Sequence, residues 1–492
     1  MQGDPERVED ARSIDGGDAP PSDATVGRTR TPRPPVRSFV GAMAAVFVLA
    51  LTVRVGAVSF VPDGTNCPAC MIGMPIMEGV GGDGAHYLFA GRALSGGRGF
   101  VVPMATEDVP YAHQPPLWTL VMAATDEIGL ETVREKKLLF ALLGAGTAVL
   151  VGLATHQVAS ERASVIAASI AAVYPGFWLY ERNFNSETIA FPLIAAVLIL
   201  AYRYRRRPGW GRALLLGAAV ALLCTARTEQ VLVIPLLLVP VLVSTPSVRW
   251  RTRVARVAAC GAIIVATLSP WTIYNLGRFE RPVLLSTGFG FTALVGACDT
   301  TFHGERLGGS DAWTCLVTSP STREKDPSVA DGLMRQAAFD YTVHHLDRLP
   351  VVAIAREGRS WGFYEPAQQV RFNGQALNAP PGATWTQVVA YWIVFACAAA
   401  GVVVLRRRRI PIYPLLTFPV IVVVTTLVTF GDSRYRATAE VSLVVFAANA
   451  IDALWSRLRS PSPGKDARPS GIPDDALAGP AGAKAASAGT TS

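Results

Sequence analysis

Long apolar runs constrain the fold of this chain more than any other feature. Residues 39–58, 189–202 and 385–405 are almost continuously apolar, with charged residues at or near their ends. A helix needs about 20 such residues to cross the hydrocarbon core of a bilayer, and only helices or closed barrels satisfy their backbone hydrogen bonds there. Because the apolar residues are continuous rather than alternating, they argue against a barrel. The sequence therefore predicts an all-α polytopic membrane protein.

The composition and the placement of charge agree with this prediction. Charged residues make up 17% of the chain and hydrophobic residues 50%, whereas soluble domains carry about 25% charged residues. A net charge of +8 would also suit a nucleic-acid partner, but the Arg residues cluster just beyond the apolar runs. This is the positive-inside pattern of membrane proteins, so we expect no nucleic-acid partner.

We predict about ten transmembrane helices, which together form a transmembrane domain over residues 38–455. The first span follows a long polar tail, unlike the short basic start of a cleavable signal peptide, so we expect it to be retained. Arg54 is the one charge inside this span and lies close enough to its outer end to snorkel. The predicted spans are 38–60, 135–157, 162–180, 187–204, 210–226, 228–246, 252–274, 385–405, 410–430 and 436–455.

The Arg clusters orient these spans in the cytoplasmic membrane. With ten spans every cluster falls on the same side, which the positive-inside rule makes the cytoplasm. Both termini are then cytoplasmic, in polar tails (1–37 and 456–492) that we expect to be disordered. Two long loops, 61–134 and 276–384, are extracytoplasmic and are expected to carry juxtamembrane helices. The clusters are Arg28 to Arg37, Arg203 to Arg207, Arg249 to Arg256, Arg406 to Arg409, and Arg457 with Arg459.

Four of the seven Cys lie in the predicted outside loops, where disulfides persist. Cys298 and Cys315 bracket a Gly-rich stretch, and we predict a disulfide between them. Cys67 and Cys70 form Cys-Pro-Ala-Cys, for which a structural bridge or tight turn is favoured over a redox dithiol or half of a zinc site. The remaining three, in apolar spans, are interpreted as packing residues: Cys224, Cys260 and Cys397.

A glycine-rich motif in the first loop, residues 81–97, holds the candidate catalytic residue Asp83. The motif predicts a short helix with Asp83 as its N-cap, His86 in its first turns and glycines at its end. Asp83 is either only this cap or also a catalytic base near the outer leaflet. Further along, Pro115 and Pro116 begin a second helix. His113, just before it, either binds a ligand or is merely solvated.

Three short outside connections hold charged residues close to the hydrocarbon, where ionisable groups are costly and usually mark a pathway or a pair. We expect them to line one polar cavity. Arg suits a phosphate because its planar fork makes two charge-assisted hydrogen bonds, and a lipid phosphate lies at this depth. The predicted site is an acidic residue above an Arg-lined pocket. The charged residues are Glu181, Arg182, Glu187, Arg227, Glu229, Asp432, Arg434, Arg436 and Glu440.

In their order and membrane placement these motifs resemble the GT-C superfamily of glycosyltransferases. The likeness is to the family 39 branch, which includes protein O-mannosyltransferases and lipid A aminoarabinose transferases. The resembling pieces are residues 83–97, 113–118 and 227–229, Ser269-Pro270-Trp271 with Asn275, Leu285-Ser286-Thr287, and residues 431–436.

The resemblance implies inverting transfer of a single sugar, such as mannose or arabinose, from a polyprenyl-phosphate carrier. The acceptor would be a glycan, a lipid or a protein outside the cytoplasmic membrane. By this likeness Asp83 is the base that deprotonates the acceptor hydroxyl. The resemblance also implies that the donor phosphate is bound by Arg227, Arg434 and Arg436. It gives supporting roles to His86, His113, Glu187 and Glu229.

One departure from the family pattern concerns the residue after Asp83. Many relatives carry a second acidic residue there, whereas this chain has Gly84. The departure argues against a paired-carboxylate or metal-bridging role. We assign no metal ligands and no cofactor, although a divalent metal stays open.

The second loop is expected to present the acceptor. Five aromatic residues there either stack on sugar rings or only anchor the loop at the membrane interface: Trp313, Phe339, Tyr341, Trp361 and Tyr364.

Two rival functions stay open. A transporter or flippase of lipid-linked substrates would place polar residues or broken helices near the bilayer midplane. A glycan ligase or polymerase would use an oligosaccharide donor. The excess of Arg over Lys, with abundant Ala, Gly and Val, is typical of high-GC bacteria such as actinomycetes.

Overall fold

The computed structural model describes residues 36–61, 79–103, 105, 107–317 and 319–459. Within these residues the chain is helical, and the one β-type pairing is an isolated bridge between Val101 and Pro110. The predicted all-α class is therefore confirmed. The two predicted tails lie outside the described residues, apart from residues 36–37 in α1 and 456–459 in α19, and so does the Cys67–Cys70 motif.

Six helices are long and apolar enough to cross a membrane. Each coincides with a span predicted from the sequence, with ends that differ by a few residues. The last of them continues to Arg459, four residues beyond the predicted boundary at 455. The six are α1 (Val36–Phe60), α4 (Val133–His156), α7 (Glu187–Arg206), α10 (Trp250–Leu276), α17 (Pro381–Arg407) and α19 (Ala437–Arg459).

The predicted span 162–180 is not one straight helix. It consists of α5 (Glu161–Val173) and α6 (Pro175–Arg182), which meet at an angle of 43°. Pro175 is the first residue of α6, a position where the missing amide hydrogen costs nothing, whereas inside a continuous helix it would remove a hydrogen bond. If the bent pair crosses as one span, the long apolar helices number seven among the described residues.

Three shorter apolar segments account for the remaining predicted spans. Two are regular helices, α8 (Trp210–Ala226) and α18 (Tyr413–Val428). The third is irregular and comprises the 3-10 helix η1 (Thr228–Leu232), the π-helix η2 (Ile234–Leu238) and α9 (Val239–Val243). Pro235 and Pro240 each remove a backbone donor here, which prevents a continuous α-helix. Helix length thus supports six or seven spans, and the count of ten stays a prediction.

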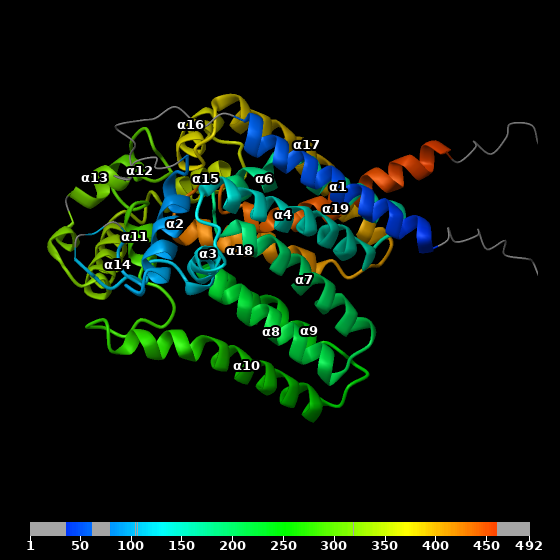
Figure 1. The fold of residues 1–492 in the computed structure, drawn as a ribbon, viewed down its shortest axis with the longest axis horizontal. Coiled ribbons are helices and arrows are strands. Elements are labelled where there is room, and N and C mark those ends of the chain that lie inside the picture. Colours follow the sequence, from blue (N-terminus) through cyan, green and yellow to red (C-terminus); the bar gives the residue numbers. More distant parts are fainter. Residues whose placement is uncertain (1–35, 62–78, 104, 106, 318, 460–492) are drawn as a thin grey trace, which may run out of the picture.

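At one end of the bundle, Arg side chains of the described residues link neighbouring helices; the predicted cluster from Arg28 to Arg37 has no described side chains. Arg206 at the end of α7 donates to Gln157 after α4 (3.1 Å to Oε1), and Arg205 donates to Tyr413 at the start of α18 (2.8 Å). Arg162 of α5 pairs with Asp452 of α19 at 2.5 Å. The two ends of the described chain, in α1 and α19, lie at this same end (Figure 1). Which side of the membrane this end faces stays a prediction.

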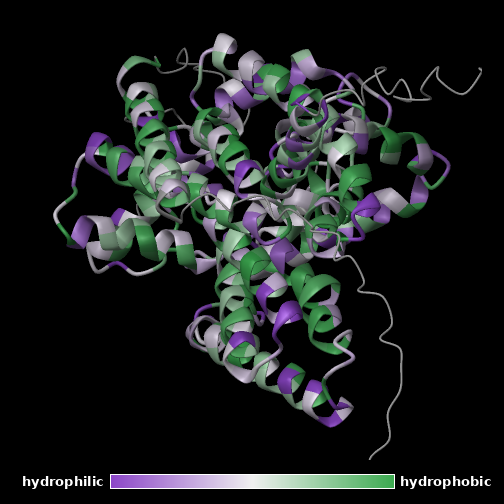
Figure 2. Cartoon of the chain, turned by 90° about the vertical axis from the view of Figure 1, so that its right-hand side faces the viewer, coloured by the Kyte–Doolittle hydropathy of each residue, from purple (hydrophilic) through white to green (hydrophobic). Residues whose placement is uncertain are grey.

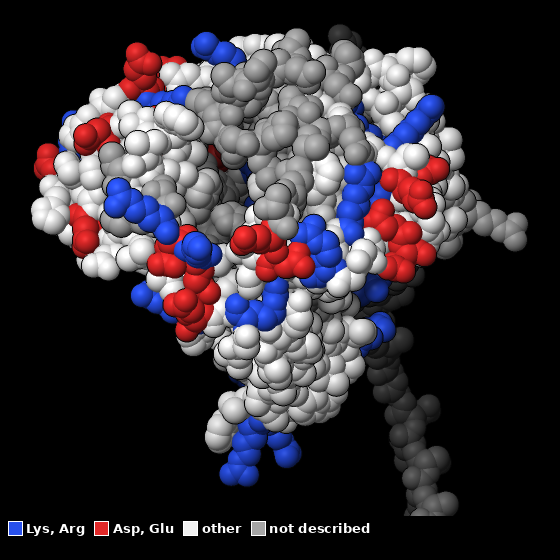
Figure 3. Space-filling model, turned by 60° about the vertical axis from the view of Figure 1, so that its left-hand side comes forward, with Lys and Arg blue, Asp and Glu red and all other residues white. Residues whose placement is uncertain are grey.

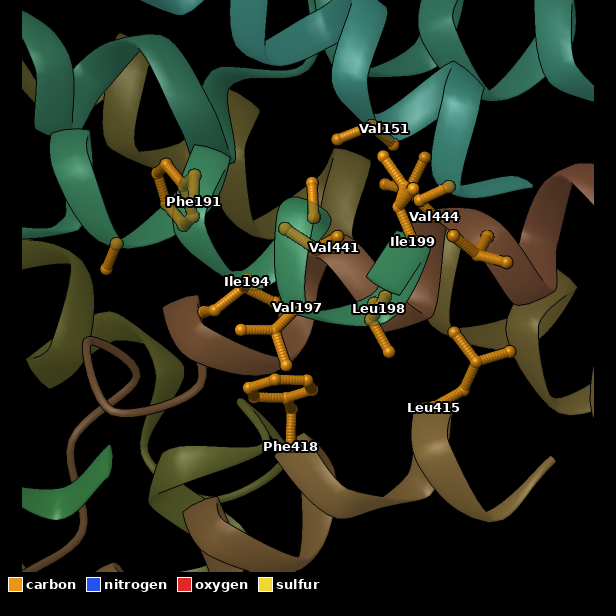
Figure 4. Packing of buried hydrophobic residues seen from close by; sticks show 14 of the residues in the cluster. Val151, Phe191, Ile194, Val197, Leu198, Ile199, Leu415, Phe418, Val441 and Val444 are labelled. Carbon is orange, nitrogen blue, oxygen red and sulfur yellow. The ribbon is translucent and has the colours of Figure 1, made fainter. Parts of the chain in front are cut away.

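The interior of the bundle is built around α7. Its apolar residues pack against α4, α18 and α19, as the labelled side chains of Phe191, Ile194, Phe418 and Val441 show (Figure 4). Apolar residues also occur on the outward faces of the helices (Figure 2). Many of these residues are well exposed, as a lipid-facing surface requires; examples are Val40, Leu215, Val265, Ile273 and Ile393.

Short helices from the two predicted outside loops form a lobe at the opposite end of the molecule (Figure 1). The first loop gives α2 (Gly82–Ser95) and α3 (Pro116–Glu127). A disulfide joins Cys298 and Cys315, with Cα atoms 5.5 Å apart, as predicted. The second loop gives α11 (Phe289–Leu294), α12 (Asp299–Phe302), α13 (Ala312–Val317), η3 (Pro320–Arg323), α14 (Pro327–His344), α15 (Leu349–Ser360) and α16 (Pro366–Ala376).

Arg54 does not snorkel as the sequence suggested. Its side chain is 2% exposed and lies between α1, α5 and α6, where Nε is 2.5 Å from a carboxylate oxygen of Glu181. The guanidinium also donates to the carbonyl of Ala172 at 3.0 Å. Gly144 of α4 makes room for the pair, because a Cβ there would lie 2.1 Å from the Glu181 carboxylate. A buried partner thus replaces the expected contact with the interface.

Candidate active site

Four segments that are distant in sequence meet where the bundle joins the lobe. They are the start of α2, the start of α7, the connection from α8 to η1, and the link between α18 and α19. Their charged side chains form a continuous series of ion pairs, which we call the open ion-pair chain. Its members in order are Asp83, Arg434, Glu187, Arg227 and Glu229.

Asp83 is the second residue of α2 and lies two positions beyond the N-cap, the position that the sequence predicted for it. The N-cap is Gly81, whose extended backbone precedes the helix. Gly81 is fixed by Asn183 at the end of α6, which accepts from the Gly81 amide and donates to its carbonyl, both at 2.9 Å. Asp83 therefore does not cap the helix, and its carboxylate is left free to pair with another group.

Gly84 is the residue at which the sequence departs from the family pattern. The structure gives a steric reason for glycine at this position. A Cβ at this position would lie 1.7 Å from the carbonyl oxygen of Asn183. The same approach that fixes the start of α2 thus leaves no room for any side chain at residue 84. A second carboxylate beside Asp83 is incompatible with this packing.

Arg434 links the two halves of the open ion-pair chain. One terminal nitrogen is 2.6 Å from Oδ2 of Asp83, and Nε is 2.7 Å from Oε1 of Glu187. Glu187 is fully buried, whereas Arg434 is 23% exposed and Asp83 is 36% exposed. The exposed end of the chain is therefore the Asp83–Arg434 pair, which is where a ligand can reach it.

Arg227 joins Glu187 to Glu229 in the open ion-pair chain and is 8% exposed. It lies 2.6 Å from Oε1 of Glu187 and also pairs with Glu229 of η1. A hydrogen bond of 3.2 Å to the Ser186 hydroxyl fixes its guanidinium further. Glu187 and Glu229, predicted as supporting residues, thus orient the two arginines.

Arg436 does not join this site, although the sequence grouped it with Arg227 and Arg434. It is 2% exposed and donates to Glu440 at 2.9 Å, one helical turn further along α19. Its guanidinium lies over the ring of Tyr391, 3.4 Å from the centroid. Because Arg436 is paired and enclosed inside the bundle, no ligand in the cavity can reach it.

A cavity of about 490 Å³ opens beside the exposed end of the chain. Its polar lining includes Asp83, Arg227 and Arg434, and the hydroxyls of Thr228 and Ser286 lie 3.1 Å apart. Apolar residues of η1 and α18 also line the cavity. They include Val231, Leu232, Val424 and Val428. The cavity can therefore hold a ligand with one anionic and one hydrocarbon part.

The two predicted histidines differ in position. His113 lines the cavity, and burial lowers the pKa of its imidazole from 6.5 to about 4. His86 lies behind Asp83, with its ring stacked 6.3 Å from that of Tyr111, and burial also lowers its pKa. Both imidazoles are therefore neutral at pH 7, and neither supplies a fixed positive charge for a phosphate.

Asp83 is ionised despite its surroundings. Burial alone raises the pKa of its carboxyl, but the positive charge of Arg434 and their hydrogen bond outweigh that effect and hold the pKa well below its usual range. Asp432, on the same link as Arg434, shows the opposite result, because burial raises the pKa of its carboxyl. Pairing with Arg434 thus distinguishes the two carboxylates.

Sequence reasoning missed several residues of the cavity and selected others that lie elsewhere. Arg306 and Phe372 of the second loop line the cavity, but no sequence motif pointed to them. None of the five aromatic residues proposed to stack on sugars lines it; Trp313 and Phe339, for example, are 75% and 66% exposed. Among the described residues no group of three or more His, Cys, Asp or Glu side chains is placed to bind a metal ion.

Comparison with known proteins gives one family match. Residues 113–274, about a third of the chain, match the dolichyl-phosphate-mannose-protein mannosyltransferase family. This stretch contains His113 and Arg227 of the cavity wall. No curated protein shows significant sequence similarity to the chain.

Solved structures of low sequence identity are also similar. The apo oligosaccharyltransferase of Archaeoglobus fulgidus is 14% identical, with a TM-score of 0.48 over 85% of this chain and 51% of that one. ArnT from Cupriavidus metallidurans, bound to undecaprenyl phosphate, is 14% identical, with a TM-score of 0.38 over 86% and 78%. The present chain spans about half the length of the archaeal protein. The family match confirms the predicted resemblance to the protein O-mannosyltransferases, and residues 113–274 are the part of the chain that carries it.

Proposed function

We propose that this protein transfers a single sugar from a polyprenyl-phosphate donor to an acceptor hydroxyl on the extracytoplasmic side of the membrane, with inversion at the anomeric carbon. The observation that carries the proposal is the pairing of Asp83 with Arg434 at 2.6 Å in the lining of a cavity that has both charged and apolar residues. This arrangement offers a base and a phosphate-binding group side by side.

In the proposed reaction Asp83 accepts the proton of the acceptor hydroxyl as the oxygen attacks the anomeric carbon. The bond from this carbon to the phosphate oxygen breaks, and the phosphate leaves with the electron pair. Arg434 and Arg227 hold the phosphate through charge-assisted hydrogen bonds. A single displacement of this kind inverts the configuration at the anomeric carbon.

Arg434 couples donor binding to the basicity of Asp83. While the site is empty, the guanidinium stabilises the ionised carboxylate, which makes Asp83 a weak base. An incoming phosphate competes for the same guanidinium hydrogens. As Arg434 turns toward the phosphate, the pKa of Asp83 rises, and the carboxylate becomes a better proton acceptor only when the donor is in place.

The apolar lining of the cavity suits the hydrocarbon part of such a donor. Val231 and Leu232 come from the end of η1, and Val424 and Val428 from α18. A prenyl chain that entered between these elements would remain next to the bilayer while its phosphate reached the arginines. Mannose or arabinose is the proposed sugar; the matched family is named for a dolichyl-phosphate-mannose donor.

The test is transfer by the full-length protein in proteoliposomes from radiolabelled polyprenyl-phosphate mannose or arabinose to envelope glycan acceptors. Asp83→Asn is expected to lower the transfer rate by about 10²–10⁴-fold, the usual contribution of a general base, while binding of undecaprenyl phosphate is retained.

Asp108→Asn is the matched control, because Asp108 lies in the same loop and pairs with Arg98 on the surface at 2.5 Å. Exposed pairs of this kind contribute little, so this variant should transfer normally. Near-normal transfer by Asp83→Asn would exclude the assigned base. Movement of intact donor across the membrane without transfer would favour a flippase.

A further inference from the structure

A second hollow, of about 370 Å³, lies next to the cavity on the side of the second loop. We call it the amide cleft, because the side chains of Gln368, Gln369 and Gln375 of α16 line it. Arg371 of the same helix and Glu305 of the loop after α12 complete its rim. None of these five residues lines the cavity that contains Asp83.

The amide cleft shares a wall with that cavity. Arg306, Ser310, Phe372 and Asp432 line both hollows. Asp432 lies two residues before Arg434 and accepts a hydrogen bond of 2.9 Å from the Arg434 amide. The shared residues therefore place the amide cleft directly beside the cavity that contains the Asp83–Arg434 pair.

Gln369 is a buried residue in the lining of the cleft. It is 6% exposed, and its amide nitrogen makes one long hydrogen bond of 3.4 Å to the carbonyl of Gly431. Its buried oxygen Oε1 has no hydrogen-bond partner among the described residues. A ligand hydroxyl that reached this oxygen would give it the hydrogen-bond partner that it lacks within the protein.

The frame around Gln369 is fixed by hydrogen bonds within the protein. Arg359 of α15 is 2% exposed and donates to the carbonyl of Leu307 at 2.6 Å and to Oε1 of Gln368 at 3.0 Å. Gln368 in turn donates to the carbonyl of Glu305 at 3.3 Å. The cleft is thus held open by the contact of α15 with α16 and the loop after α12, which reduces the ordering cost of binding.

The lining favours a ligand rich in hydroxyl groups. An amide donates through nitrogen and accepts through oxygen, so three Gln side chains match hydroxyls in either role. Phe372 on the shared wall adds an apolar ring face for a sugar. On the face of the lobe seen in Figure 3, acidic and basic side chains are intermixed, and neither sign of charge dominates.

We infer that the amide cleft binds the acceptor and that the acceptor is a glycan. The inference rests on the proposed function, because it takes the neighbouring cavity as the site of the donor. A glycan chain lies along Gln368, Gln369 and Arg371, and its terminal sugar passes Phe372 to bring one hydroxyl toward Asp83. Phe372 would then provide the ring for sugar stacking, which was one of the two interpretations of other aromatic residues in the second loop.

The test measures binding to the full-length protein in detergent by saturation-transfer NMR, without donor. The probes are α-linked mannohexaose and arabinohexaose, with an end-blocked Ser- and Thr-containing hexapeptide of the same length. At least one hexasaccharide is expected to bind saturably. Gln369→Leu should weaken that binding about three- to tenfold, as the loss of one or two neutral hydrogen bonds predicts.

Two further variants separate a local effect from a folding defect. Gln387→Leu is the matched control, because Gln387 is buried in α17 and lines neither hollow; it should bind the hexasaccharide as the unaltered protein does. Arg371→Ala alters an exposed residue of the rim and should weaken binding about two- to threefold, with normal folding.

Binding of undecaprenyl phosphate is measured in parallel and should be the same in all four proteins. If the hexasaccharides do not bind, bind equally to Gln369→Leu, or are outcompeted by the hexapeptide, the glycan inference is overturned, whatever the donor result. If the hexasaccharide result is as expected but undecaprenyl phosphate does not bind the unaltered protein, the proposed function fails and the glycan cleft stands.

Discussion

Two groups of buried ion pairs use the same residue types and differ in their access to a ligand. The Arg54–Glu181 pair is enclosed, since both side chains are at most 3% exposed and Arg54 also donates to backbone carbonyls. The open ion-pair chain is buried at Glu187 but exposed at Asp83 and Arg434. The first group can only hold helices together, whereas the second can exchange a partner for a ligand.

The difference shows what a functional ion pair requires at membrane depth. Desolvation makes any charge there costly, so each must be paired. Arg54, Arg434 and Arg436 all satisfy this condition. Only Arg434 has both a carboxylate partner and an open face, and this combination allows a phosphate to replace the carboxylate. The Arg436–Glu440 pair is enclosed like that of Arg54.

The largest predicted effect concerns the enclosed pair. Glu181→Ala leaves the Arg54 guanidinium buried without a carboxylate, and removing one partner of a buried pair costs about 3–5 kcal/mol of stability. Unfolding of the detergent-solubilised protein by heat or denaturant measures the loss. The double variant Arg54→Leu, Glu181→Leu should recover most of it, because both charges are gone. A cost below about 1 kcal/mol for Glu181→Ala would contradict the structural role.

A smaller effect is expected at the open chain. Arg434→Lys keeps the positive charge, and so the fold, but loses the planar fork that grips a phosphate. Binding of undecaprenyl phosphate, measured by calorimetry, should weaken at least about tenfold, the loss of one charge-assisted hydrogen bond. Arg162→Lys is the control, because Arg162 also pairs with an Asp, at the other end of the bundle. Equal affinities of the two variants would refute the assignment.

The smallest effect depends on pH and concerns His113 beside the open chain. Its folded-state pKa of about 4 lies below the ordinary 6.5, so as pH falls below 6.5 the unfolded chain takes up a proton that the folded protein does not. Stability should therefore fall from pH 7.5 to pH 5. His113→Gln should make this fall shallower without removing it, because the pKa of His86 is lowered too. Identical slopes in thermal unfolding would show that His113 is not buried in the neutral form.

Much of the site could be predicted from the sequence because membrane depth restricts where charges occur. Glu187, Arg227 and Arg434 stand at the ends of apolar segments, and the ends of antiparallel helices that face the same side must lie near one another. Asp83 could be found because glycines mark the start of its helix. Arg306, Phe372 and Gln369 could not, because they lie in a loop region whose path depends on contacts between short helices.

The sequence by itself determined which segments are apolar helices, which of their ends carry Arg clusters, and which two cysteines pair in the second loop. The apolar helices and their charged ends follow from local composition, because the free energy of transfer into lipid depends on the residues of one segment. The cysteine pair follows from the position of both residues in one predicted outside loop. The tertiary structure alone decided that Arg434 meets Asp83 while Arg436 turns into the bundle. It also decided that Gly84 admits no second carboxylate, because Asn183 occupies that space. Such outcomes depend on how neighbouring elements pack, and two arginines separated by one residue can therefore face entirely different surroundings.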